Sequence, residues 1–394
     1  MKVTTEVNRP YVPASGTTVA ARVDVDPGEW DRSQGVQRHV ALCIDTSGSM
    51  EGEKIQRARD GASWVFGLLD PDDYVSIVAF DSNVDVVLHP TRWGDTTREE
   101  AMARVDDLDA GGKTDMYAGL QAAKRALAGL EGDDTVRRLL LLSDGRDSNR
   151  EPIDFERLAE DVDDAGIRIE SAGIGTDYNA ETIRTLGTTA RGEWTHLERP
   201  GDIEEFFGAA VERAESVVAP DARLELDLAP GVSVSDVFRS LPQAQAVDLA
   251  WDGGTAVVKL PDLVDRERQV VVMRVSVPEA TVDGEREQTL ATVHLRTRDG
   301  RVSEDLTVTY TDDNGKLARN NEDVAIDHRR TMVRTELGRG NVEAAETEIE
   351  RMTEIHGAET DVVQEVQRQT ELVKEGGRAE RSQATKIVDD EGVQ

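Results

Sequence analysis

The chain has a single cysteine among its 394 residues. Cys43 lies inside the apolar run Val40–Ile44, so we expect a small buried core residue rather than a reactive thiol. One cysteine cannot form a disulfide within the chain, which excludes the disulfide frameworks that stabilise many small secreted domains. This absence favours a cytoplasmic protein.

Long apolar runs are also missing. No stretch approaches the roughly 20 apolar residues that a membrane-spanning helix needs. The first residues, Met1–Glu6, lack the apolar segment of a secretory signal. We therefore expect no membrane insertion and a cytoplasmic location.

Positive charge is scarce. Lys and Arg together number 46 against 79 Asp and Glu, which gives a formal net charge of −33. Such a surface repels nucleic acids and anionic membranes, so neither is expected as a partner. The acidic residues are spread along the whole chain and Arg outnumbers Lys, a pattern typical of halophilic intracellular proteins, in which concentrated salt screens the self-repulsion. An ordinary acidic protein is the alternative.

The central part of the chain alternates strand-like and helix-like segments. A chain of this length exceeds one ordinary domain, and residues 36–219 carry the alternating pattern. The run Val136–Leu142 is almost entirely apolar, as expected of a central parallel strand buried on both faces. Residues 74–80 and 84–88 lie close enough to form a hairpin. The pattern predicts an α/β domain with a mostly parallel sheet, one antiparallel edge strand and helices on both faces.

The pattern changes to strands after Ala219-Pro220. Residues 222–229 alternate between apolar and charged side chains, and turn sequences separate several later strand-like runs, at 255–260, 268–277, 289–296 and 303–310. Residues 220–315 are therefore predicted to form an antiparallel β-sandwich. Residues 1–35 contain similar strands, so we expect them to pack with the sandwich and the α/β domain to be inserted between them.

The end of the chain is predicted to be helical. Residues 320–376 contain three helical segments separated by glycines. Residues 377–394 are polar and are expected to form a disordered tail.

The residues that carry chemistry begin in the segment Asp45–Ser49, which directly follows the first strand of the α/β domain. In open α/β sheets, ligands bind beyond the carboxyl ends of the strands, where the strand order reverses. Gly48 allows a tight loop that can turn the oxygens of three alternate residues inward: Asp45, Ser47 and Ser49.

Two further oxygen donors are expected at the same edge of the sheet. Thr114 lies in the glycine-rich loop Gly111–Asp115, which opens a helix. Asp144 ends the central strand, in the sequence LLSDG. Two carboxylates with neutral hydroxyls form a donor set that suits Mg²⁺, which prefers about six oxygen ligands and keeps several waters.

These three segments, DTSGSM, GGKTDMYAGL and LLSDG, resemble the metal-site loops of the von Willebrand factor A domain, in the same order. The resemblance covers about residues 38–219 and implies a Rossmann-like fold with a metal-ion-dependent adhesion site. It implies that the site consists of Asp45, Ser47, Ser49, Thr114 and Asp144. With the acidic composition, it suggests a haloarchaeal member of the family.

The resemblance also implies a function. We expect a protein-interaction module for adhesion or scaffolding, not an enzyme, in which Mg²⁺, or else Mn²⁺ or Ca²⁺, coordinates an Asp or Glu presented by a partner protein. Loops 46–53, 109–115, 145–152 and 175–179 are expected to form the rim, with Arg146 and Arg150 among its residues. No cofactor besides the metal is expected, and the oligomeric state stays open.

Two alternatives are weighed against this function. The chain could be the non-ATPase subunit of a chelatase-like or other multiprotein machine, with the ATPase supplied by another polypeptide. A P-loop in this chain is not supported, because Asp107 stands where the first glycine should be. A Mg²⁺-dependent phosphatase is less favoured, because Ser47 stands where the second aspartate of that nucleophile strand should be.

Overall fold

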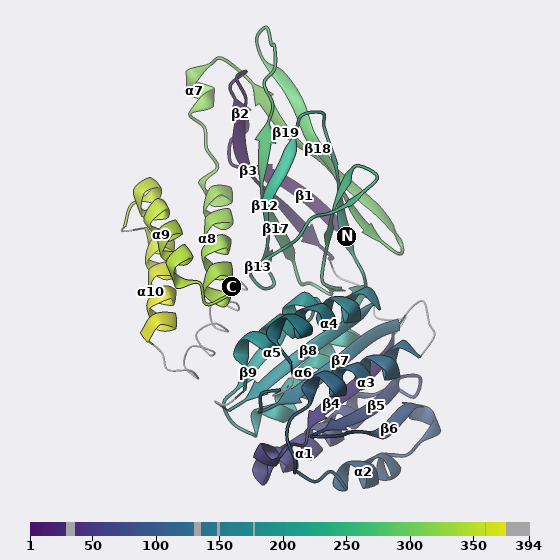
Figure 1. Ribbon diagram of the computed structural model, residues 1–394. Helices are drawn as coiled ribbons and strands as arrows, with labels where there is room; N and C mark the ends of the chain where they lie inside the picture. The colour runs from purple at the N-terminus through teal and green to yellow at the C-terminus, as the bar shows by residue number, and fades with distance from the viewer. Residues whose placement is uncertain (29–35, 130–134, 148–149, 176–177, 359, 376–394) are drawn as a thin grey trace. The chain divides into compact units, whose positions relative to one another are not determined.

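The computed structural model describes residues 1–28, 36–129, 135–147, 150–175, 178–358 and 360–375 (Figure 1). The chain divides into two compact units, one made of Met1–Trp30 with Val218–Gln394 and the other of Asp31–Val217. The predicted tail, 377–394, lies outside the described residues. No helix among the described residues is long and apolar enough to cross a membrane.

The second unit is built on one six-stranded sheet in the order β6-β5-β4-β7-β8-β9. All neighbours pair in parallel except β5 and β6, which form the antiparallel edge hairpin. The predicted α/β fold is thereby confirmed. Its strands are β4 (Gln37–Asp45), β5 (Tyr74–Phe80), β6 (Val84–Arg92), β7 (Thr135–Ser143), β8 (Ile167–Ile174) and β9 (Trp194–Leu197).

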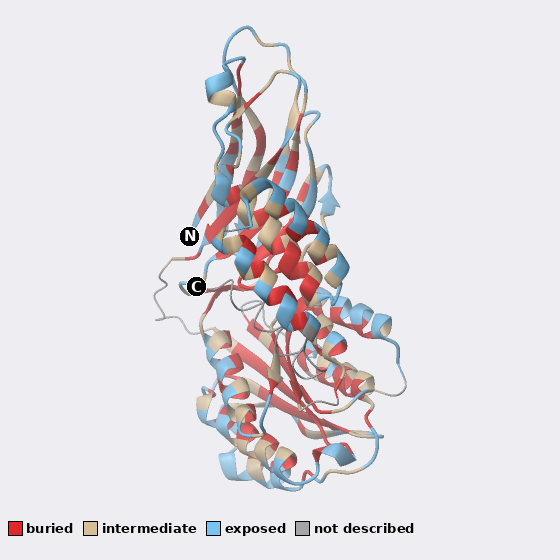
Figure 2. Cartoon of the chain, turned by 90° about the vertical axis from the view of Figure 1, so that its left-hand side faces the viewer, coloured by how far each residue is buried: buried red, intermediate tan, exposed pale blue. Residues whose placement is uncertain are grey.

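Helices cover both faces of this sheet. Core side chains of α1, α2 and α6 pack on one face, and those of α3, α4 and α5 on the other. Figure 2 shows the buried residues in red along the strands and on the inward sides of the helices. The bounds are α1 (Glu53–Leu68), α2 (Arg98–Asp106), α3 (Met116–Ala128), α4 (Pro152–Asp164), α5 (Ala180–Thr189) and α6 (Asp202–Glu215), with short 3₁₀ turns η1 (Gly48–Met50) and η2 (Trp93–Asp95).

The order of the strands reverses at the centre of the sheet. The chain runs outward from β4 to β5 and β6, and then returns to the other side of β4 to form β7. Parallel strands bring their carboxyl ends to one edge, so the loops after β4 and β7 become neighbours at the reversal. This is the position at which Asp45 and Asp144 occur in the chain.

The first unit contains a five-stranded sheet, β1-β3-β17-β12-β13, and a six-stranded sheet, β14-β15-β11-β18-β19-β2. One apolar core takes residues from both sheets, as in a sandwich. β3, near the start of the chain, pairs with β17 along its length, so the α/β unit interrupts the sandwich in sequence. The strands are β1 (Lys2–Val7), β2 (Tyr11–Val12), β3 (Thr17–Asp26), β11 (Arg223–Leu228), β12 (Ser233–Leu241), β13 (Gln245–Ala246), β14 (Ala250–Asp252), β15 (Thr255–Lys259), β17 (Gln269–Val277), β18 (Arg286–Thr297) and β19 (Gly300–Tyr310), with two further short strands, β10 (Val217–Ala219) and β16 (Leu263–Val264).

The sandwich differs from the sequence prediction in two respects. β12 was not predicted, because its first half consists mainly of exposed polar residues and does not show a clear apolar alternation. The sandwich is also not purely antiparallel, since β2 pairs with β19 in parallel. Only two residue pairs make this contact, Thr309 with Tyr11 and Tyr310 with Val12, which is too short a segment to read from the sequence.

The last segments that the structure describes are helices, as predicted. The bounds are α7 (Asn314–Leu317), α8 (Glu322–Gly338), α9 (Val342–His356) and α10 (Asp361–Glu375). α8, α9 and α10 share a small apolar core. An ion pair fixes α8 to the sandwich, since Arg22 on β3 contacts Asp327 at 2.8 Å.

A buried ion pair anchors the start of β4, the strand that leads to Asp45. The carboxylate of Asp73 accepts hydrogen bonds from the backbone N–H of Arg38 at 2.8 Å and from its Nε at 2.9 Å. It also accepts from the backbone N–H of Asp70 at 2.8 Å. Arg38 and Asp73 are 1% and 2% exposed, and Asp73 is the buried partner of this guanidinium, whereas its other carboxylate contacts, Asp70 at 3.0 Å and Glu215 at 3.6 Å, are exposed.

We expect Asp73→Ala to lower the free energy of unfolding by about 3–5 kcal/mol, because it leaves a buried guanidinium without its main partner. The neighbouring Asp72 contacts Arg92 with 74% of its side chain exposed, and Asp72→Ala should cost less than about 1 kcal/mol. Chemical denaturation of both variants measures the difference. Equal losses would contradict the structural role of the buried pair.

Candidate metal centre

Asp45 is the last residue of β4 and is fully buried. Its Oδ1 accepts a hydrogen bond from the backbone N–H of Ser47 at 2.8 Å, which turns the chain sharply after the strand. Its Oδ2 accepts from the hydroxyl of Ser143, the last residue of β7, at 2.5 Å. The carboxylate is therefore held in place by both of the strands that meet at the reversal point.

The two serines of the loop link Asp45 to the second carboxylate. The hydroxyls of Ser47 and Ser49 are 3.1 Å apart, and that of Ser49 donates to Oδ1 of Asp144 at 2.6 Å. Ser47 and Asp144 are 2% and 1% exposed, whereas Ser49 is exposed. The cluster therefore extends from the interior of the sheet edge to the surface at Ser49.

Thr114 joins the cluster through backbone contacts between loops. The N–H of Gly48 donates to the carbonyl of Gly112 at 3.2 Å, and the N–H of Gly111 donates to the carbonyl of Thr46 at 2.8 Å. A methyl group on Gly145 would lie 2.7 Å from Oγ1 of Thr114 and 3.6 Å from Oδ2 of Asp45. Both oxygens thus lie against the same glycine, and a larger residue there would disturb them.

The structure accordingly brings together all five residues predicted from the sequence: Asp45, Ser47, Ser49, Thr114 and Asp144. They come from three loops at one edge of the sheet. All five donors are oxygens, which suits a hard divalent cation. Within the described residues, no group of three or more His, Cys, Asp or Glu side chains is placed to bind a metal.

The electrostatics of the cluster favour an added cation. Burial raises the pKa of Asp45 to about 6, against hydrogen bonds from Ser143 and Ser47 that lower it, and the nearby charge of Asp144 raises it further. Two buried carboxylates of like charge are costly to keep ionised together. The residues present therefore fit a divalent cation in chemistry and in charge.

Lys54 is a member of this cluster that the sequence did not single out. Its ammonium forms an ion pair with Oδ2 of Asp144 and lies 3.3 Å from the carbonyl oxygen of Ser49. It projects from the first turn of α1, directly after the Asp45–Ser49 loop. In the sequence, the only indication of this contact is that Lys54 follows shortly after the loop, at the start of a helix. A lysine in that position is by itself expected to be solvated. Ser143 was likewise not predicted.

The predicted rim is described in part. Arg146 is exposed, and the guanidinium of Arg150 lies 4.5 Å from the ring centre of Tyr117. Residues 148–149 and 176–177 of the predicted rim lie outside the described residues. Asp147, in the loop after β7, accepts a hydrogen bond at 3.0 Å from the backbone N–H of Tyr117, near the start of α3. This bond connects the loop after β7 to the helix that follows Thr114.

Comparison with known families identifies this unit. The family model of the von Willebrand factor type A domain matches residues 39–209. Residues 39–209 are a von Willebrand factor type A domain. Domains of this family commonly mediate protein–protein interactions and typically bind a divalent cation.

Solved structures share the fold of nearly the whole chain. A von Willebrand factor type A protein from Catenulispora acidiphila superposes with a TM-score of 0.80 at 18% identity, covering 98% of this chain and 96% of that one. The ArnB paralog VWA2 from Sulfolobus acidocaldarius gives a TM-score of 0.65 at 17% identity, covering 100% and 99%. The combination of units therefore recurs, although such low identity shows the fold alone.

Curated relatives match the chain less completely. The Synechocystis protein sll0103 is 25% identical over 65% of this chain, which spans 59% of that protein. The rat inter-alpha-trypsin inhibitor heavy chain H3 is 28% identical over 59% of this chain, which spans 26% of that protein. The chain thus spans less than two thirds of the length of each of these relatives. One further relative, WAV3 of Arabidopsis thaliana, is named an E3 ubiquitin-protein ligase, at 23% identity.

We expect Lys54→Met to strengthen Mg²⁺ binding by about three- to tenfold, because the variant lacks an ammonium that repels the cation and competes for Asp144. In the absence of metal the same variant should be less stable, since Asp144 loses its ion-pair partner. Calorimetric titration measures the affinity. Lys124→Met is the matched control, because Lys124 pairs with Asp161 on the helical surface at 2.5 Å. Weaker Mg²⁺ binding in Lys54→Met would show instead that Lys54 positions the carboxylate.

Proposed function

We propose that this chain is a divalent-cation-dependent protein-interaction module and not an enzyme. The proposed site is a metal-ion-dependent adhesion site whose ligands are Asp45, Ser47, Ser49, Thr114 and Asp144. A bound Mg²⁺, or Mn²⁺ or Ca²⁺ in its place, would offer a coordination position to an Asp or Glu side chain of a partner protein. The observation that carries the proposal is the convergence of these five oxygen donors from three loops.

The carboxylates and the hydroxyls of the proposed site have different roles. Asp45 and Asp144 balance the charge of the cation from buried positions, where their geometry is fixed by hydrogen bonds from Ser47, Ser49 and Ser143. Neutral hydroxyls keep the total negative charge low, so an incoming carboxylate is not repelled as strongly as by a site made of acids alone. Ser49 is the exposed member of the cluster, so we expect the partner to approach from its side.

The proposal is tested with a soluble carboxylate. N-acetyl-glutamate amide should shift the backbone NMR signals of Ser49 and Lys113 in the presence of Mg²⁺, and the shifts should vanish in chelator. N-acetyl-glutamine amide, which has no charge, should cause no such shifts. The Ser47→Ala and Asp45→Asn variants should lose the response, because each removes a proposed ligand.

Ser63→Ala, a serine on α1 outside the site, is the matched control and should respond like the wild type. A glutamate response that persists in chelator, or in both ligand variants, would count against the adhesion site. Mg²⁺-dependent turnover of a generic phosphoester, lost in Asp45→Asn, would replace the proposal with the phosphatase alternative. Recovery of a stoichiometric ATPase subunit with the chain would place the module in a chelatase-like machine.

We also propose that the acidic surface is an adaptation to concentrated salt inside a halophilic cell. The net charge of −33 causes self-repulsion that only high ionic strength screens. Melting temperatures should therefore fall substantially between molar KCl and dilute buffer. Equal melting temperatures in both would contradict halophilic adaptation.

A further inference from the structure

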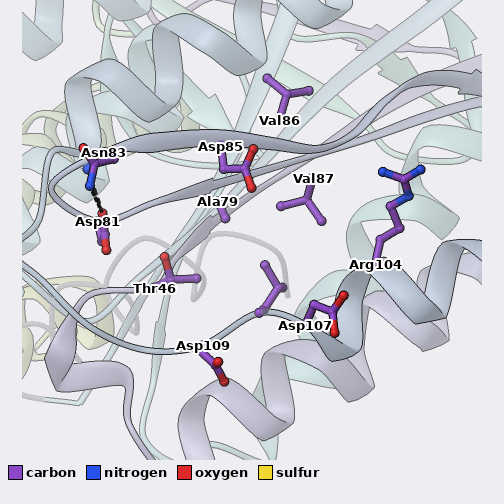
Figure 3. Close-up of a pocket in the computed structure, with 11 residues that line it drawn as sticks. Thr46, Ala79, Asp81, Asn83, Asp85, Val86, Val87, Arg104, Asp107 and Asp109 are labelled. Carbon is purple, nitrogen blue, oxygen red and sulfur yellow. Dashed lines mark hydrogen bonds between the residues drawn. The ribbon is translucent and has the colours of Figure 1, made fainter.

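A cavity lies beside the proposed metal site, in the same unit. It has a volume of about 490 Å³, which is within the range of small-ligand pockets, about 300–1,000 Å³. Figure 3 shows residues of β5, β6, α2 and the loop after α2 around it. Its lining residues are Thr46, Ala79, Asp81, Asn83, Asp85, Val86, Val87, Arg104, Asp107, Leu108 and Asp109.

The cavity shares its wall with the metal-site loops. Thr46 stands between the proposed ligands Asp45 and Ser47 in the chain, and its carbonyl oxygen accepts from the N–H of Gly111 at 2.8 Å. Asp81 lies directly against the loop that carries Thr114, since a methyl group on Gly112 would approach its Oδ2 to 2.9 Å. One bound segment can therefore reach both places.

The charge of the cavity is strongly one-sided. Four aspartates line it against one arginine, Arg104. Asp109 lies 3.6 Å from Arg59, and Asp81 accepts the backbone N–H of Asn83 at 2.7 Å. Asp85 and Asp107 form no ion pair with any residue in the part of the chain that the structure describes. Both are exposed, so their charge is available to a ligand.

An unpaired hydroxyl points into this cavity. Thr46 is 6% exposed, and among the described residues none forms a hydrogen bond with its side chain. Figure 3 shows the side chain of Thr46 in the pocket between Asp81 and Asp109. The hydroxyl oxygen of Thr46 is not one of the fully buried unpartnered atoms among the described residues, so it is open to the cavity and can form a hydrogen bond with solvent or with a ligand.

The chemistry of the cavity excludes some ligands. Anions are repelled. The apolar side chains Ala79, Val86, Val87 and Leu108 suit an aliphatic stem, while the carboxylates suit a cationic end. Arg and Lys side chains have this combination of stem and charge.

We propose that this cavity binds the side chain of an arginine or lysine in the partner segment that presents its carboxylate to the metal site. The partner is then a peptide segment with an acidic residue and a basic residue a few positions apart. The proposal has two halves. The acidic half, binding of the partner's carboxylate at the metal site, rests on the proposed function. The basic half, binding of the partner's arginine or lysine, depends on the cavity alone. The two halves can therefore fail separately.

The basic half is tested with N-acetyl-arginine amide and its uncharged analogue N-acetyl-citrulline amide, in the lowest KCl concentration at which the protein still melts cooperatively. The arginine compound should shift the backbone NMR signals of Thr46, Asp85 and Leu108, with or without chelator, and citrulline should not. Asp85→Asn with Asp107→Asn should weaken its binding about tenfold, as expected for loss of charge-assisted hydrogen bonds.

The matched control neutralises two exposed acids of α4, Glu156→Gln with Glu160→Gln, which changes the net charge equally. It should leave arginine binding unchanged. Equal binding of citrulline, or equal weakening in the α4 control, would overturn the cavity as a specific cation site.

The linked partner is tested with capped peptides in which arginine and glutamate are separated by glycine spacers of increasing length. With Mg²⁺, one spacer length should bind at least about tenfold more tightly than N-acetyl-arginine amide, because the second contact forms within one complex. Chelator or Ser47→Ala should abolish this gain and leave the arginine contact. If each amide binds alone but no spacer length gives tighter binding than the arginine amide, the proposal that one partner segment fills both sites is wrong. If the glutamate amide never binds, the proposed function fails and the cation site stands.

Discussion

Two buried carboxylates of like charge at one edge of the sheet are the constraint on which the α/β unit depends. Asp45 and Asp144 are almost a hundred positions apart in the chain, and the reversal of strand order between β4 and β7 brings them together. Burial raises the pKa of Asp45, and the charge of Asp144 adds to the effect. Hydrogen bonds from three serines and the ammonium of Lys54 offset part of the repulsion. A divalent cation would offset the rest. The repulsion between Asp45 and Asp144, which destabilises the fold, is therefore also what favours binding of the proposed cation.

The sequence predicted the residues that end strands, because hydrophobic runs mark where buried strands stop. Asp45 follows the first such run and Asp144 follows another, and the spacing of Ser47 and Ser49 is local. Lys54 and the aspartates of the cavity beside the metal site could not be predicted in this way. Their placement depends on how α1, α2 and the β5–β6 hairpin pack, and a charged residue on a helix surface or in a turn carries no local signal for that.

The sandwich shows the same limit. The alternating residues of β3 and the strand-like run at 268–277 predicted strands on both sides of the α/β unit, and the two do pair. β12 was missed, since its exposed half has serines and an aspartate where alternation would need apolar side chains. It forms nevertheless because β17 supplies its backbone partners and the buried residues of its second half, Val237 and Phe238 among them, join the apolar cores. Tertiary pairing thus decided a strand that propensity did not favour.

The most direct test of the account is a calorimetric titration of Mg²⁺ into the full chain in molar KCl, compared with the variant that combines Asp45→Ala and Ser47→Ala. The account predicts saturable binding of one Mg²⁺ per chain in the wild type and none in the folded variant. Wild-type protein that is folded and binds no Mg²⁺, Mn²⁺ or Ca²⁺ would contradict it. Equal binding by the wild type and the variant would likewise show that the cation is held elsewhere.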